Sequence, residues 1–90
     1  MSGPNAPGRR AAARHQAGLD HGRRGDYAAA ARCFEQAVAI DGRNAAYVAN
    51  LGEAYRRLGH LERAVDAFAR AAALGPDLAA ARFGLANALK

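Results

Sequence analysis

The pattern of apolar and polar positions indicates helices rather than strands. No stretch alternates apolar with polar residues over five or more positions, and valine and isoleucine are scarce. Alanine supplies much of the apolar content, and alanine favours helix while burying little area per residue. The chain is therefore predicted to be all-α with a thin, close-packed core, and five helices are expected, at 9–23, 27–40, 45–58, 61–74 and 78–89.

The two ends of the chain differ in this pattern. The opening "MSGPNAPG" holds two prolines and two glycines, so residues 1–8 are predicted to be a disordered tail before a domain at 9–90. The last predicted helix carries an apolar stripe through Leu78, Ala81, Leu85, Ala88 and Leu89. Phe83 points away from this stripe, so this helix is expected to be an imperfect cap whose free side pairs with another chain or with a continuation of this one.

The chain repeats itself with a period of 34 residues, which separates Gly25 from Gly59 and Phe34 from Phe68. The repeat units are 11–44, 45–78 and a half-unit at 79–90. Small residues recur at the same offset, and the two helix-breaking positions Gly42 and Pro76 also match. The other pairs in register are Gly18 with Gly52, Ala30 with Ala64, and Ala37 with Ala71.

The second unit carries a recognisable motif. It has Val48-x2-Leu51-Gly52-x2-Tyr55, then Ala64-x3-Phe68, then Ala71 and Pro76. With this period and motif the chain resembles a tetratricopeptide repeat protein over almost its whole length. The first unit departs from the family pattern at Ala17 and His21. The resemblance implies antiparallel helix-turn-helix repeats stacked as a short right-handed α-solenoid.

The recurring residues have physical roles of their own. Gly25 and Gly59 stand where one helix ends and the next begins, and glycine tolerates a left-handed backbone there. Asp26 is expected to cap the following helix, whereas His60 in the matching place is a poorer cap.

The helical glycines at 18 and 52 suggest a close approach of two helix backbones, because glycine inside a helix is unfavourable. Ala30 and Ala64 are expected to face Gly18 and Gly52 from the second helix of each pair. Phe34 and Phe68 are expected to fill the space between successive helix pairs.

The charge pattern changes this picture little. The formal net charge is +5, but acids lie among the arginines, as in "LERAVD", which is typical of a solvated helix surface. Arg9, Arg10 and Arg14 would suit phosphate contacts, yet no aromatic platform or nucleic-acid motif accompanies them. The solvated surface is therefore favoured, and a nucleic-acid-associated protein is the third hypothesis, which predicts binding that weakens steeply with salt. The absence of an apolar run of membrane-span length favours a cytoplasmic protein without a membrane contact.

Candidates for chemistry are few. His15, His21 and His60 do not have a metal-ligand spacing, and Cys33, the single cysteine, is expected to be a small hydrophobe beside Phe34. The chain has one serine, Ser2, and no threonine. We therefore predict no catalytic, cofactor-binding or metal-binding residues, and no enzymatic activity.

The family resemblance implies that first-helix side chains line a concave binding groove. Asn50 matches the clamp that captures chaperone carboxyl termini, but His15, Leu19, Ala80 and Gly84 do not, so that function is rejected. The candidate partner-binding residues are His15, Gln16, Leu19, Ala49, Asn50, Glu53, Arg57, Phe83 and Asn87.

The leading hypothesis is a non-catalytic protein–protein interaction module or scaffold that binds another protein or peptide, with an acidic partner favoured by the arginines. The alternative is the amino-terminal repeat segment of a larger enzyme such as a transferase, serving targeting or self-association. The sequence names neither the partner nor the pathway.

Overall fold

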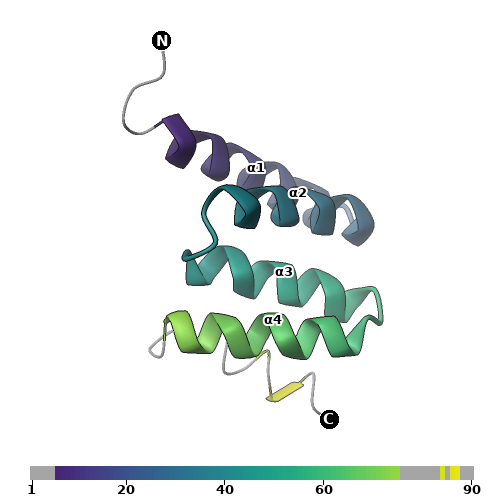
Figure 1. Ribbon diagram of the computed structural model, residues 1–90. Coiled ribbons are helices and arrows are strands. Elements are labelled where there is room, and N and C mark those ends of the chain that lie inside the picture. Colours follow the sequence, from purple (N-terminus) through teal and green to yellow (C-terminus); the bar gives the residue numbers. More distant parts are fainter. Residues whose placement is uncertain (1–5, 76–83, 85, 88–90) are drawn as a thin grey trace.

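Four helices stack one after another in the computed structural model, which describes residues 6–75, 84, 86 and 87 (Figure 1). They are α1 (Ala6–Arg23), α2 (Tyr27–Ile40), α3 (Ala45–Arg57) and α4 (Leu61–Leu74). Each helix packs against the next one along the chain. The two antiparallel hairpins, α1–α2 and α3–α4, meet through α2 and α3. The prediction of an all-α, solenoid-like helical repeat is thus confirmed.

The first helix begins earlier than expected. α1 starts at Ala6, three residues before the predicted start at residue 9, so the last three residues of the predicted tail, 6–8, are helical. Pro7 lies in the first turn, where its missing N–H has no intrahelical acceptor and its fixed φ suits a helix. Residues 1–5 lie outside the described residues. Gly84, Ala86 and Asn87 are helical, but Pro76 and the rest of the predicted helix 78–89 also lie outside them.

Both turns within the hairpins use the same motif, one repeat apart. Gly25 and Gly59 each have φ of 80°, the left-handed conformation predicted for them. The amide of Asp26 donates to the carbonyl of His21 at 2.9 Å, and that of His60 donates to the carbonyl of Tyr55 at 2.9 Å. These six-residue bonds, closing over a left-handed glycine, define the Schellman motif and satisfy carbonyls at the helix ends.

The helix starts differ in the way they are capped. Asp26 Oδ1 accepts from the amide of Ala29 at 3.1 Å, as predicted, and Asn44 Oδ1 accepts from the amide of Tyr47 at 3.2 Å. His60 makes no side-chain cap bond. Its backbone angles, φ −83° and ψ 71°, nevertheless nearly match those of Asp26, −89° and 76°. The weaker start of α4 is therefore a property of the side chain and not of the backbone.

The core depends on two phenylalanine rings seated on helical glycines. A Cβ added to Gly18 would lie 2.5 Å from Phe34, and one added to Gly52 would lie 3.0 Å from Phe68. The nearest atoms at both glycines belong to these rings, so Phe34 and Phe68 make the closest contacts there. Without side chains, the two glycines let a bulky ring from the second helix approach the first.

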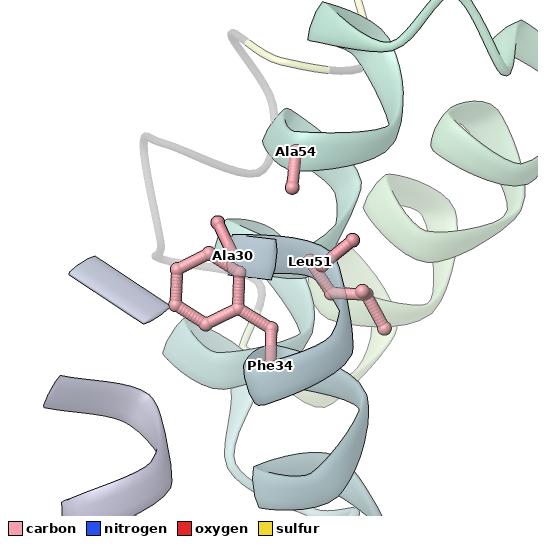
Figure 2. Close-up of a cluster of buried hydrophobic side chains, with 5 residues drawn as sticks. Ala30, Phe34, Leu51 and Ala54 are labelled. Atoms are coloured by element: carbon pink, nitrogen blue, oxygen red, sulfur yellow. The ribbon is translucent and has the colours of Figure 1, made fainter. Parts of the chain in front are cut away.

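The same rings fill the space between hairpins. Phe34 is 5 % exposed and clusters with Leu51 and Ala54 of α3, as predicted (Figure 2). Phe68 is 2 % exposed, and it also contacts the position of Gly84. The alanines that recur in register are completely buried, namely Ala30, Ala37, Ala64 and Ala71. Close packing of small residues around two large rings thus holds the repeats in phase.

Tyr55 joins the hydrophobic clusters of the two units. Its half-buried ring packs against the clusters around Phe34, Val48 and Phe68. Its hydroxyl donates to Glu35 Oε2 of α2 at 2.5 Å. Burial, together with this bond to a carboxylate, raises the pKa of Tyr55 to about 12. Tyr55 is therefore a neutral hydrogen-bond donor that ties α3 to α2.

Alanine substitutions at two glycines of α1 should have opposite effects. Gly18→Ala should destabilise the fold, because overpacking against Phe34 costs about 1–3 kcal/mol and outweighs the roughly 1 kcal/mol gained in helix propensity. Gly22→Ala should stabilise it by up to about 1 kcal/mol, because no atom lies within 4 Å of its added Cβ. Urea denaturation measures both. Equal effects at the two sites would contradict the role given to Phe34.

Capping generates a second prediction. His60→Asp should raise the free energy of unfolding by about 1 kcal/mol, because the backbone already holds the geometry in which Asp26 caps α2. Asp26→Ala should lower it by a similar amount. Thermal and urea unfolding of both variants provide the measurement, and a His60→Asp protein no more stable than wild type would contradict the assignment.

Candidate protein-binding groove

A hollow lies between α1 and α3, the first helices of the two units. Its volume is about 280 Å³. It exists because α1 contributes glycines and α2 and α3 contribute alanines along this face, so little side-chain volume fills the space. The residues that line it are Gly18, Leu19, Gly22 and Arg23 of α1, Tyr27, Ala30 and Phe34 of α2, and Asn50, Glu53 and Ala54 of α3.

A polar contact between His15 and Asn50 connects α1 to α3 beside this hollow. The Nδ2 amide of Asn50 lies 2.6 Å from Nε2 of His15, and it donates when that nitrogen carries no proton. The imidazole lies 4.5 Å from the Tyr47 ring and 5.5 Å from the Phe34 ring, between ring centroids. Burial among these rings lowers the pKa of His15. The neutral imidazole therefore acts here as a structural link.

Glu53 is the carboxylate of the groove, and two arginines hold it. Arg56 donates to it through Nε at 2.9 Å and Nη2 at 2.7 Å, and Arg57 donates through Nε at 2.8 Å. The hydrogen bond from Arg56 is the main cause that lowers the pKa of Glu53. Arg57 also lies 5.5 Å from the centroid of the Tyr27 ring. The arginines thus keep Glu53 ionised and fix its orientation.

A second hollow continues the first on the other side of α3. Its volume is about 310 Å³. Asn50 and Glu53 line both hollows, so the two adjoin each other at α3. The residues that line the second hollow are Ala49, Asn50, Glu53, Arg56, Arg57, Phe68, Gly84 and Asn87. We call the two hollows together the groove.

The structure places most of the predicted binding residues along this groove. Leu19 lines the first hollow, and Arg57 and Asn87 line the second. Gln16 is exposed, lines neither hollow and donates to Asp20 Oδ1 at 3.2 Å. Phe83 lies outside the described residues.

Ala49 lines the second hollow, although it is only 4 % exposed and belongs to the core around Val48. It offers a partner part of the groove floor and no protruding side chain. Ala49 lies on the side of α3 that packs against α4, where it clusters with Ala67 and Ala71.

Apart from the repeat-signature residues Gly18, Ala30, Phe34 and Phe68, the sequence analysis missed six groove residues: Gly22, Arg23, Tyr27, Ala54, Arg56 and Gly84. Gly22 carries a signal that could have revealed it. It lies inside α1 but has no glycine one period later, where Arg56 stands. A helical glycine that the repeat does not require, and whose added Cβ would meet no atom within 4 Å, is available to shape a surface.

The described helices also limit the other kinds of site. None of them is both long enough and apolar enough to span a membrane. Among the described residues, no three His, Cys, Asp or Glu side chains gather closely enough to hold a metal ion. Cys33 is a free, half-buried thiol on α2.

The stacked hairpins and the groove along their first helices define a helical-repeat protein. A sequence model of the tetratricopeptide repeat matches residues 15–79 and 50–89. Because these matches span most of the chain, it belongs to the tetratricopeptide repeat family. Tetratricopeptide repeats are generally protein-interaction modules. A comparison with curated proteins found no match.

The His15–Asn50 link makes stability depend on pH. Because folding lowers the pKa of His15, its contribution is present above the unfolded value of 6.5 and is lost as the pH falls through the folded value. The stability of wild type relative to His15→Gln should therefore fall between about pH 7 and pH 5. Urea denaturation at several pH values measures this difference in stability. Both proteins contain His21 and His60, so the effects of these two residues cancel. A constant difference would show that the link does not select neutral His15.

Proposed function

We propose that this chain is a non-catalytic interaction module that binds an extended segment of a partner protein in the groove across α3. The observation that carries the proposal is that Asn50 and Glu53 line both hollows, so the two hollows lie next to each other on one face. A rigid array of helices presents this surface, and a preorganised surface lowers the entropic cost of binding.

The polar groups of the groove support binding rather than catalysis. His15 is tied to Asn50, and Glu53 is tied to Arg56 and Arg57, so the side chains that could exchange protons are engaged in structural contacts. Asn50 offers an amide to a partner backbone, and Arg57 is exposed at the rim. Fixed hydrogen-bonding groups beside apolar floor residues are suited to orienting a peptide.

An acidic partner is part of the same proposal. Arg23, Arg56 and Arg57 line the groove, against the carboxylates of Glu53 and of Asp20 beside Arg23. The whole chain adds a formal charge of +5, which favours approach of an acidic segment. We further propose a scaffold role in the cytoplasm, with which the single free thiol of Cys33 is compatible. Self-association through residues 78–89 stays a prediction.

A charge-reversal pair tests the binding surface. The tagged wild-type chain should retain specific proteins from a lysate of its source cell, and Arg57→Glu should weaken their binding about tenfold or more, because it reverses a charge at the groove rim. Arg32→Glu is the matched control, since Arg32 is exposed on α2 and does not line the groove.

Circular dichroism confirms that both variants fold, and quantitative pull-down at several protein concentrations compares their affinities. If the two variants retained the same proteins equally well, the groove would not be the binding surface.

A further inference from the structure

The structure assigns a partner chemistry to the first hollow: we propose that it receives one leucine- or methionine-sized apolar side chain of an extended peptide, with a carboxylate of the neighbouring peptide residue paired to Arg23. This inference rests on the proposed function and specifies which segment the groove selects. A single side chain and a single charge make it testable.

The size and floor of the hollow favour a small apolar group over a large ligand. Its volume of about 280 Å³ lies just below the range of roughly 300–1,000 Å³ that is common for small-molecule sites. Leu19, Phe34 and Ala54 provide apolar walls, and Phe34 is itself held in place by its seat on Gly18. A rigid apolar depression of this size favours burial of an apolar anchor.

Gly22 leaves this hollow open. A Cβ added at Gly22 would have no atom within 4 Å, so the position borders empty space and not packed protein. Unlike Gly18, it does not make room for a ring of this chain. The open space is thus available to a side chain from outside.

The charges at the rim favour a carboxylate next to the apolar anchor. Arg23 lines the hollow and pairs with Asp20, but this pair is largely solvated, with the Arg23 side chain 66 % exposed and that of Asp20 47 %. Such a surface pair contributes little, so Arg23 can exchange Asp20 for a partner carboxylate. Glu53 on the opposite wall is already bonded to two arginines, which reduces its repulsion of an acidic peptide.

Filling the hollow from within provides the decisive variant. Gly22→Leu should place its own side chain in the hollow, because Gly22 lines it and a Cβ added there would meet no atom within 4 Å. Gly8→Leu is the matched control, since Gly8 also lies in α1, has no atom within 4 Å of an added Cβ and does not line the hollow. Both variants replace a helical glycine by a good helix former, so both should fold.

A display library of random twelve-residue peptides, selected on the wild-type chain, serves as the probe. We expect the selected peptides to share an apolar residue next to Asp or Glu. Gly22→Leu should weaken their binding about tenfold or more, as should replacement of the apolar peptide residue by serine, whereas Gly8→Leu should bind like wild type. Arg23→Gln should weaken the binding of acidic peptides and make their affinity less dependent on salt concentration.

The outcomes separate this inference from the proposed function. Peptides that lose affinity with Arg57→Glu but bind Gly22→Leu like wild type would overturn the inference and leave the groove as the binding surface. Peptides affected by neither variant, or a selection that yields no binder, would overturn both. A wild-type chain that dimerises through the hollow, and becomes monomeric in Gly22→Leu, would show that a second copy is the occupant and would also overturn the inference.

Discussion

The seating of a phenylalanine ring on a helical glycine is the contact on which this structure depends. At Gly18 and at Gly52 the ring of the following helix occupies the place where a side chain would be. A glycine inside a helix is unfavourable by about 1 kcal/mol relative to alanine, so its presence at both sites reflects the burial that it allows. The rings of Phe34 and Phe68 then reach beyond their own hairpins, and Phe34 packs against Leu51 of the next unit. One contact thus closes a hairpin and joins it to its neighbour.

Two polar contacts on different faces complement this apolar joint. Tyr55 of α3 bonds to Glu35 of α2, and Asn50 of α3 bonds to His15 of α1. Both involve a neutral group, because burial raises the pKa of Tyr55 and lowers that of His15. A neutral partner avoids the desolvation cost of a buried charge. The first unit is consequently linked to α3 by one polar contact from each of its helices.

The same use of small residues produces both the core and the groove. Where a ring of the chain fills the space beside a glycine, as at Gly18, the result is a closed joint. Where no ring of the chain packs against the glycine, as at Gly22, the space remains an open hollow. The two glycines lie one helical turn apart on α1, so the same face of one helix serves packing at one level and a surface depression at the next. Alanines at positions 30 and 54 extend the depression toward α2 and α3.

Much of the fold could be predicted from the sequence, because the period of 34 residues repeats local signals. Glycines at turns, the Asp26 cap, and alanine and phenylalanine in register are all local or periodic features, and the structure confirmed them. The start of α1 was mispredicted because a proline near a helix start is compatible with helix, so composition alone misplaced the boundary.

The groove could be predicted only in outline, because its contacts join residues far apart in sequence. His15 and Asn50 are separated by 35 positions, and no local pattern indicates that they bond. The rotation of each helix about its axis decided that Ala49 is buried and that Gly22 borders empty space. The sequence by itself determined which helices form and in what phase they repeat. Only the tertiary structure decided which of their small residues are buried and which border a hollow, because burial depends on where the side chains of neighbouring helices lie.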